Sequence, residues 1–339
     1  MAQVVEAVRR PAAASRQWRV WRQPFLWIVL LAIVAVSLLP VVTGSASLRE
    51  ELFLLLMLVV LASSVNIIMG YTGYVSFGHV VFFGLGGYFA FFLMQGFQVH
   101  FIPAALVAAA AATLCAAVVG APVLRLRGAY FALATIGINE ATRAFVTNFQ
   151  PFGGSTGMFF NFAVYASYGG PAGALWLAYS AIVVIALATV ATSYVIKQSK
   201  FGLALMAIRE DQDAAQVLGI NPAPYKIAAF ACSAFFPALA GAAFFFKNGV
   251  IEPGSAFHLL TSIEALVMVM LGGFGTVTGP IAGAVIYERL RTMLLINPLF
   301  RALHLAIAGV LLLVIVLFLT QGFVGELRQR VPRLRKYLE

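Results

Sequence analysis

The sequence predicts an all-α polytopic membrane protein, and three observations support this fold class. Of its 339 residues, 62% are hydrophobic and 10% are charged, whereas about 25% of the residues of a soluble domain are charged. Two long stretches, 52–124 and 144–196, contain no Asp, Glu, Lys or Arg. Apolar blocks of about 20 residues recur, and this is the length of a helix that crosses a hydrocarbon core. These features exclude a soluble enzyme, a nucleic-acid-binding protein and a disordered chain, because each of these needs a solvated face.

Ten apolar segments are expected as helices, whereas a membrane β-barrel would show alternating segments of about ten residues. The segments are 24–42, 52–69, 76–95, 101–121, 129–147, 173–196, 227–246, 263–272, 279–295 and 302–319. We therefore expect about ten crossings. The range is eight to ten, because the eighth segment is too short to cross the membrane alone. The first is predicted to be a retained helix, because it is longer than the apolar core of a signal peptide, about 7–15 residues. The membrane domain should therefore span residues 24–320.

Charges outside these segments predict the orientation of the chain. Most of the net charge of +10 lies in two basic tails, 1–23 and 321–339. The positive-inside rule places both tails in the cytoplasm, which requires an even number of crossings; binding of nucleic acid or lipid is the alternative interpretation of such tails. The loops that carry Arg125, Arg127 and the 197–226 charges should then be cytoplasmic too. Some charges do not follow the rule: Arg49 with Glu50 and Glu51, Lys247, Arg289, Arg291 and Arg301.

Two glycine-rich stretches, 70–79 and 272–280, are expected to break helices. Each places two glycines three residues apart, followed by hydroxyl residues and another glycine, and glycine frees the backbone to unwind or to pack closely. Paired interruptions can mark an internal repeat with the pathway or gate between its halves. Close helix packing through small residues is the alternative. The glycines concerned are Gly70, Gly73, Gly78, Gly272, Gly273, Gly275 and Gly279.

The one sizeable polar segment, 199–222, lies between the sixth and seventh apolar segments. We expect a helix, with Leu205, Ile208, Ala215 and Leu218 at roughly helical spacing. Gly219 is a plausible residue just past its end, and the prolines that follow forbid its continuation. A half-apolar helix in a cytoplasmic loop suggests a docking surface for a partner. A helix that lies on its own membrane face is the alternative.

The chain lacks the motifs of an enzyme or a metal site. No GxxxxGK[ST] phosphate loop occurs, so any ATPase should be a separate chain. The GGSTG stretch at 153–157 matches GxSxG by letter, but it lies between membrane spans rather than on a strand–turn–helix. We interpret it as a turn or as a contact for an external partner. Cys115 and Cys232 lie inside apolar blocks and should be small core residues.

Polar residues inside the apolar segments are the candidates for a substrate pathway. Glu140 and Arg143 are three residues apart on one helix face, where they can pair. Ionisable groups at membrane depth are costly and usually face the interior, either paired to fix packing or lining a passage. The candidates for the pathway are Asn66, Tyr71, Ser76, His79, Tyr130, Asn139, Glu140, Arg143 and Glu264. For each of them a structural role in packing is the alternative.

Five stretches of the chain form a combination that is specific to one family. They are GYTGYVSFGHVVFFGLGGY (70–88), LRLRGAYFALATIGINEATR (124–143), GGSTG (153–157), SKFGLALMAIREDQDAAQVLGINPAPYK (199–226) and SIEALVMVMLGGFGTVTGPIAGA (262–284). In order and content they resemble the permease subunits of branched-chain amino acid ABC transporters, and the longer of the two permease types in particular. The resemblance covers about residues 50–325.

The resemblance implies an all-helical, type II-like importer permease in the inner membrane of a bacterium. A second related permease would pair with it, two cytoplasmic ATPase subunits would bind ATP and Mg²⁺, and a periplasmic binding protein would deliver the substrate. The chain itself would be a transport subunit and no enzyme, in contact with lipid and with no nucleic acid. The expected cargo is a branched-chain or related hydrophobic amino acid. Urea, short amides or another small solute are alternatives, and an ion-coupled secondary transporter or a non-transporting scaffold are more distant ones.

The resemblance also assigns the coupling helices that sit in a groove of the ATPase to residues 199–219. Arg209, Glu210 and Asp211 match the charged centre of this motif. The residues assigned to coupling are Gly202, Ala207, Arg209, Glu210, Asp211, Ala215 and Gly219. Ala129 stands where the family often has an acidic residue, so the sequence offers no charge for a role at that position.

Overall fold

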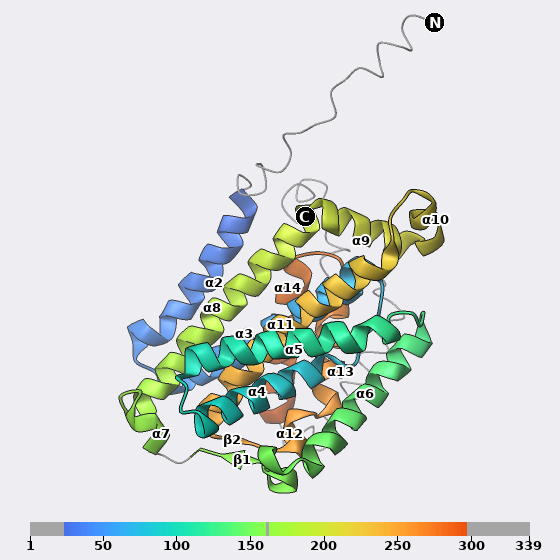
Figure 1. Cartoon of the computed structure of the whole chain (residues 1–339). Coiled ribbons are helices and arrows are strands. Elements are labelled where there is room, and N and C mark those ends of the chain that lie inside the picture. Colours follow the sequence, from blue (N-terminus) through green and yellow to red (C-terminus); the bar gives the residue numbers. More distant parts are fainter. Residues whose placement is uncertain (1–23, 161–162, 297–339) are drawn as a thin grey trace, which may run out of the picture.

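The computed structural model describes residues 24–160 and 163–296 and confirms the all-α polytopic fold (Figure 1). The long helices are α2 (Pro24–Thr43), α3 (Ala46–Thr72), α4 (His79–Gly96), α5 (Phe101–Val123), α6 (Ala129–Asn148), α8 (Gly170–Gln198), α11 (Pro222–Asn248), α13 (Leu259–Gly272) and α14 (Thr278–Ile296). They correspond to the first nine predicted segments. The tenth segment, 302–319, and both basic tails lie outside the described residues.

Short elements join these helices. They are the 3₁₀ turns η2 (Gln150–Phe152) and η3 (Gly154–Thr156), the helices α7 (Ala163–Ala166), α9 (Lys200–Glu210), α10 (Gln212–Val217) and α12 (Pro253–Ala256), and the strands β1 (Met158–Phe159) and β2 (Val250–Ile251). The two strands pair antiparallel, with Met158 opposite Ile251. By length and composition, seven stretches of the described chain can cross a membrane: most or all of α2, α3, α4, α5, α8 and α11, and α12 together with α13.

Helix α3 forms the centre of the bundle. Ser45 caps its first turn by accepting a hydrogen bond from the Leu48 amide, and nearly every side chain from Leu52 to Thr72 is buried. A helix that is apolar on all sides belongs in the interior. Accordingly, α3 packs against α8, α11, α13 and α14.

Helices α4 and α11 cross at very close range. A Cβ added to Gly86 of α4 would overlap the backbone of Ala238, and one added to Gly241 of α11 would overlap the carbonyl of Phe83. Small residues allow two helix backbones to approach this closely.

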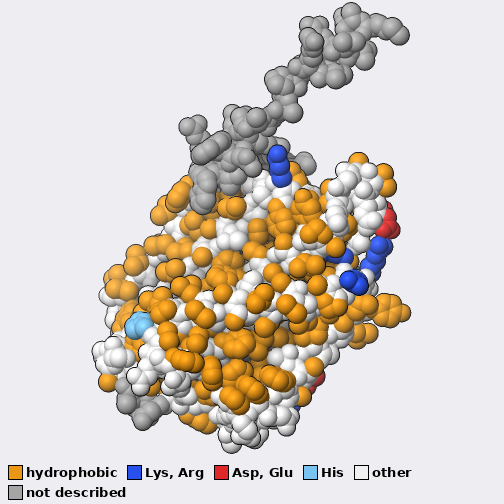
Figure 2. All heavy atoms as spheres, viewed as in Figure 1, with side chains coloured by type: hydrophobic (Ala, Val, Ile, Leu, Met, Phe, Trp, Pro, Cys, Tyr) orange, Lys and Arg blue, Asp and Glu red, His pale blue; other side chains and the backbone are white. Residues whose placement is uncertain are grey.

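The bundle has two distinct ends (Figure 1). Helices α9 and α10 project at one of them, which we call the loop end, and α7, α12, β1 and β2 lie at the other. Two charges that break the positive-inside rule neutralise each other, because Lys247 forms an ion pair with Glu50. The surface between the ends is mostly apolar, whereas Lys, Arg, Asp and Glu side chains gather near α10 (Figure 2). An apolar belt of this kind is what a lipid-facing surface requires.

Candidate functional site

Both glycine-rich stretches interrupt helices, as the sequence predicts. Helix α3 ends at Thr72, where Gly73 adopts a left-handed conformation (φ 77°) and its amide donates to the Met69 carbonyl. Non-helical backbone then runs to the start of α4 at His79. The second break lies between α13 and α14, with Gly273 at φ 115° and Gly275 at φ 74°. These positive φ angles are why glycine is needed at the two breaks.

The two breaks touch each other through Asn66. Its Nδ2 donates to the Thr276 carbonyl and its Oδ1 accepts from the Gly275 amide, both at 2.9 Å. A Cβ added to Gly70 would lie 2.6 Å from the Gly275 nitrogen, so only glycine permits this approach. We call this contact, with Asn66, Gly70, Gly73, Phe274, Gly275 and Thr276, the glycine junction. Sequence periodicity could not find it, because the two breaks are more than 200 residues apart.

Arg209 of α9 reaches into the glycine junction. Its Nη1 donates to the Gly70 carbonyl at 2.7 Å, and its guanidinium carbon lies 5.1 Å from the ring centroid of Phe274. The Gly70 carbonyl belongs to the last turn of α3, where a cation also meets the negative end of the helix dipole. A guanidinium over an aromatic face adds a cation–π attraction. One side chain thus joins α9 to both breaks.

The segment 199–219 forms two helices, α9 and α10, where the residue pattern predicted a helix and the family resemblance implied more than one. The break occurs at Asp211, whose extended backbone and carboxylate cap α10 by accepting from the amides of Asp213 and Ala214. Of the four apolar residues at helical spacing, Leu205, Ile208 and Ala215 are buried, whereas Leu218 at the end of α10 is 79% exposed. The predicted stop is confirmed: Gly219 has φ 84°, and the Ile220 amide donates to the Ala215 carbonyl.

The other residues assigned to coupling are placed as follows. Ser199 caps α9 by accepting from the Gly202 amide, and a Cβ at Gly202 would overlap the Ile196 carbonyl of α8. Ala207 of α9 is partly buried, and Ala215 is the buried residue of α10. Of the charged centre, Arg209 points to the glycine junction and Asp211 caps α10, while the Glu210 side chain is 80% exposed. Glu210 Oε1 lies 3.9 Å from Arg209 Nε, so the exposed Glu210 carboxylate forms a long ion pair with Arg209 at the end of α9.

A second contact ties α10 to the first break, and the sequence did not indicate it. Lys226, near the start of α11, donates to the Tyr74 hydroxyl, the Leu124 carbonyl and the Gln212 Oε1, at 2.9, 2.7 and 3.2 Å. Beside it, Arg127 forms an ion pair with Asp213 at 3.0 Å, and this guanidinium lowers the pKa of the Asp213 carboxyl. A lysine that follows Asn-Pro-Ala-Pro-Tyr at a helix start was the only available signal.

Several predicted pathway residues are buried and tie helices of this chain together. The Tyr71 hydroxyl lies 2.8 Å from Ser193 Oγ, His79 Nε2 lies 3.0 Å from Ser233 Oγ, and Asn139 Nδ2 donates to the Phe257 carbonyl at 3.0 Å. Ser76 Oγ accepts from the Gly78 amide, where the first break meets the start of α4. Glu264 is partly buried on α13. These contacts support the structural role that the sequence left open for such residues.

The other predicted pathway residues lie on the exposed face of α6. This helix buries Phe131, Thr135, Asn139 and Val146 against the bundle. On its other side stand Tyr130, Leu133, Gly137, Glu140 and Arg143. The predicted pairing of Glu140 with Arg143 is confirmed at 3.3 Å, but both side chains are about half exposed and do not face the interior of this chain. Helix α6 therefore presents a face with an ion pair and large apolar residues that nothing in the described chain covers.

No catalytic or metal-binding arrangement is found among the described residues. Gly153–Gly157 forms 3₁₀ turns between α6 and β1, and Gly157 packs against Ile251 and Glu252. This context differs from the strand–turn–helix of a nucleophile elbow. The described residues contain no group of three or more His, Cys, Asp or Glu that could hold a metal ion. Cys115 and Cys232 are free thiols with intermediate burial.

A family model described as "branched-chain amino acid transport system / permease component" matches residues 47–316. The "high-affinity branched-chain amino acid transport system permease protein LivM" of Escherichia coli is 29% identical over 290 residues, which are 77% of this chain and 66% of the relative. The protein of the same name from Salmonella typhimurium is 29% identical over 292 residues, with the same shares.

A further relative is the "autoinducer 2 import system permease protein LsrC" of Photorhabdus laumondii, which is 30% identical over 150 residues, 42% of this chain and 45% of the relative. The chain spans just under two thirds of the length of the first two relatives. No solved structure matches the chain significantly.

Proposed function

Because the chain belongs to the family of branched-chain amino acid transport permease components, we propose that it is one permease subunit of an ATP-driven ABC importer. Its cargo would be branched-chain or related hydrophobic amino acids, delivered by a periplasmic binding protein. The observation that carries this proposal is the extent of the family match, 47–316, which includes both glycine breaks, the coupling loop and α6. A second, related permease and two ATPase subunits that bind ATP and Mg²⁺ would complete the importer.

The proposed orientation places the loop end in the cytoplasm of a bacterium, at its inner membrane. The cations Arg125, Arg127, Lys200 and Lys226 all lie at this end, as expected on the cytoplasmic side of a membrane. The opposite end, with β1, β2 and the 153–157 turns, would then receive the binding protein. Cargo identity is tested by ATP-dependent uptake of labelled leucine into liposomes that hold the full importer. Uptake driven by an ion gradient without ATPase subunits would contradict the proposal.

The tip of α10 is proposed as the contact with the ATPase. Val217 and Leu218 are 88% and 79% exposed there, in a polar segment that cannot hide them in the hydrocarbon. Exposed apolar residues that are rimmed by polar ones mark protein contacts, and the exposed Glu210 lies on the neighbouring helix.

Changing Val217 and Leu218 together to Asp is expected to reduce ATPase co-purification by roughly tenfold or more, because central apolar anchors carry most of the binding energy of an interface. The pair Val217→Asn with Leu218→Asn is the matched control, since it removes the apolar tip without adding charge. Normal ATPase co-purification with this pair would show that added negative charge, and not loss of the apolar tip, weakens the contact.

The contacts of Arg209 support a mechanical route from the ATPase to the pathway. When ATP closes the ATPase pair, α9 and α10 would move with it. Arg209 would pass this displacement to the Gly70 carbonyl and to Phe274, and hence to both breaks at once. Lys226 and Gln212 provide a second link, from α10 to Tyr74. Glycine breaks are the places where the backbone can change direction at low steric cost.

The exposed face of α6 is proposed as a wall of the pathway against the second permease. An ion pair at membrane depth is costly in lipid and is tolerated at a protein interface or a polar passage. Either Glu140→Gln or Arg143→Gln alone is expected to lower uptake by at least about tenfold, because a charge left unpaired in a desolvated interface costs about 2–5 kcal/mol.

The swapped pair Glu140→Arg with Arg143→Glu should recover most of this uptake, since it restores neutrality. The thermal stability of the isolated chain should change little in all three variants, because half-exposed pairs contribute about 0–1 kcal/mol. Normal uptake by both single variants would place this face of α6 away from the pathway.

A further inference from the structure

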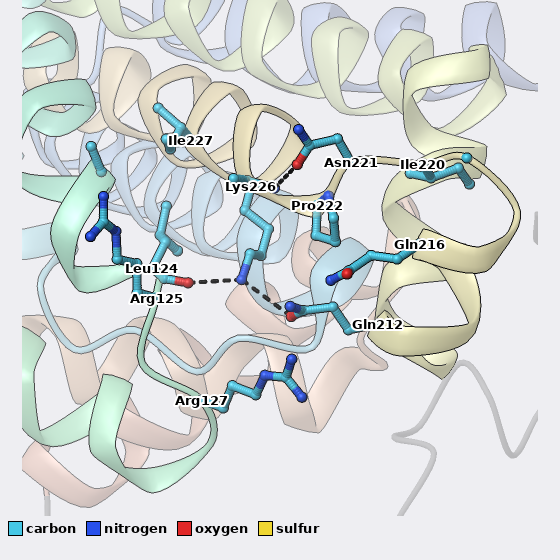
Figure 3. A pocket seen from close by; sticks show the side chains of 13 residues that line it. Leu124, Arg125, Arg127, Gln212, Gln216, Ile220, Asn221, Pro222, Lys226 and Ile227 are labelled. Atoms are coloured by element: carbon cyan, nitrogen blue, oxygen red, sulfur yellow. Dashed lines mark hydrogen bonds between the residues drawn. The ribbon is translucent and has the colours of Figure 1, made fainter.

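A cavity of about 620 Å³ opens at the loop end, beside the link that Lys226 and Gln212 make to Tyr74. It lies between the end of α5, helix α10 and the start of α11 (Figure 3). Its lining includes Leu124, Arg125, Arg127, Gln212, Gln216 and Lys226. We call it the basic pocket.

The basic pocket carries an excess of positive charge. Arg125, Arg127 and Lys226 line it, and none of the described residues that line it is acidic. Arg127 is paired with Asp213, which stands outside the lining. The Arg125 amide donates to the Pro122 carbonyl, and its guanidinium has no hydrogen-bond or ion-pair partner among the described residues. An anion that enters the pocket would therefore meet one free guanidinium and the shared guanidinium of Arg127.

Lys226 adds a charge that is not neutralised locally. Its side chain is buried, with 3% of the residue exposed, and its three hydrogen-bond acceptors are the neutral oxygens of Tyr74, Leu124 and Gln212. A buried ammonium without a carboxylate partner is costly, because the lost hydration is repaid only in part by neutral acceptors. An anion in the pocket would offset this cost through its field, without displacing any of the three acceptors.

The pocket stands at the level where two apolar helices leave the hydrocarbon. Helix α5 ends at Val123, two residues before Arg125, and α11 begins at Pro222. One side of the lining is apolar, with Leu124, Ile220 and Ile227. Figure 3 shows Arg125 and Arg127 on the segment after α5 and Lys226 on α11, around the same opening. Basic pockets between membrane helices on the cytoplasmic side suit acidic lipid headgroups.

The geometry of α10 separates this pocket from the proposed ATPase contact. Gln212, Gln216 and Gly219 line the pocket and recur every three to four residues, so they share one face of the helix and its cap. Val217 and Leu218 fall on the other sides of α10 and are exposed. A partner protein that covers the apolar tip would leave the pocket facing the membrane surface.

We propose that the basic pocket binds a phosphate anion, and that an acidic phospholipid such as phosphatidylglycerol supplies it. The phosphate group of the lipid accepts hydrogen bonds from Arg125 and Arg127. The acyl chains of the lipid lie along the apolar side of the pocket. Because the pocket lies between α5, α10 and α11, the bound lipid stabilises the position of α10 relative to α5 and α11. That the lipid belongs to the cytoplasmic leaflet rests on the orientation proposed above. Binding of the lipid to the isolated chain can be measured whether or not the importer transports its cargo.

Native mass spectrometry of the purified full chain, with phosphatidylglycerol as the probe, tests the proposal. Arg125→Gln is expected to weaken retention of the lipid about fivefold, the effect of one basic residue near an anionic surface. Ala223→Glu, which places a carboxylate in the lining, should weaken it by more than about tenfold. The first turn of α11 tolerates this change, because an acidic residue is favourable at a helix N-terminus.

Ala214→Glu is the matched control, since it adds the same carboxylate on the face of α10 that points away from the pocket, and it should leave retention unchanged. Competition by inorganic phosphate alone, at the same concentration as the lipid, would assign the site to a free anion and overturn the lipid as its source. Equal retention by the parent chain and Ala223→Glu would overturn the site itself. Release of the lipid when the ATPase subunits bind would assign the pocket to a protein contact and overturn the proposal as well.

Discussion

Replacing Arg209 with Gln is expected to reduce ATP-dependent uptake by at least about tenfold, while the ATPase subunits still co-purify with the permease. The change removes the charged donor to the Gly70 carbonyl and the cation over Phe274. Hydrogen bonds of charged groups contribute about 1.5–3 kcal/mol, and this one joins α9 to both breaks. ATP hydrolysis should therefore continue without transport. Uptake and ATP hydrolysis measured on the same liposomes check the result.

Two further variants sharpen this experiment. Arg209→Lys keeps the charge but cannot hold the planar, forked geometry of a guanidinium, so uptake should fall to an intermediate level. Lys200→Gln removes one exposed positive charge at the other end of α9 and serves as the control for net charge. If Arg209→Gln instead lost its ATPase subunits, the side chain would serve docking, and the proposed route through the glycine junction would be wrong.

Replacing Gly272 with Ala is expected to destabilise the folded chain by about 2 kcal/mol or more, because overpacking forces backbone shifts. The new Cβ would overlap the carbonyl of Gly279 and would lie 2.9 Å from the Gly283 nitrogen. Both neighbours are backbone atoms of α14, and they cannot rotate out of the way. The α13–α14 hairpin would have to open, so the midpoint of thermal unfolding of the purified chain in detergent should fall.

Gly137→Ala is the matched control for Gly272→Ala. Gly137 lies in the middle of α6 and has open space around its Cα, so alanine there should raise stability by about 0.5–1 kcal/mol through helix propensity. Opposite signs are therefore expected from the same chemical change at two helical glycines. Equal midpoints for the two variants would mean that α13 and α14 are not in close contact at Gly272.

The existence and approximate place of the long helices could be predicted from the sequence because they depend on local patterns, although α3 and α11 begin several residues before the apolar segments that predicted them. Apolar blocks marked the first nine helices, Gly219 marked the end of α10, and the spacing of Glu140 and Arg143 predicted their ion pair. The two glycine breaks were also predicted, since closely spaced glycines followed by hydroxyl residues favour an interruption, although the same pattern left close helix packing open. These features need only the neighbouring residues in the chain.

The side-chain directions could not be predicted, because they depend on tertiary contacts. Arg209 was expected to face a partner, but its guanidinium donates to a carbonyl at the end of α3 and forms a long ion pair with the neighbouring Glu210. Asn66 sits on a helix that is buried on all sides, so its position in the sequence gave no direction for its amide. Burial alone also could not distinguish a residue that ties helices, such as His79, from one that lines a passage. The break at Asp211 was missed because an aspartate among charged residues also fits a continuous helix.

The contact between Asn66 and Thr276 has a consequence for biosynthesis. The two residues are separated by 210 positions, and a ribosome adds about 5–20 residues per second. The Asn66 amide therefore waits roughly 10–40 s for its partners after it has been made. During that time it must be sheltered by the insertion machinery or by neighbouring helices, since an unpaired amide in lipid is costly. Termination of synthesis before residue 275 would leave α3 with an orphaned amide, a feature by which quality control could recognise an unfinished chain.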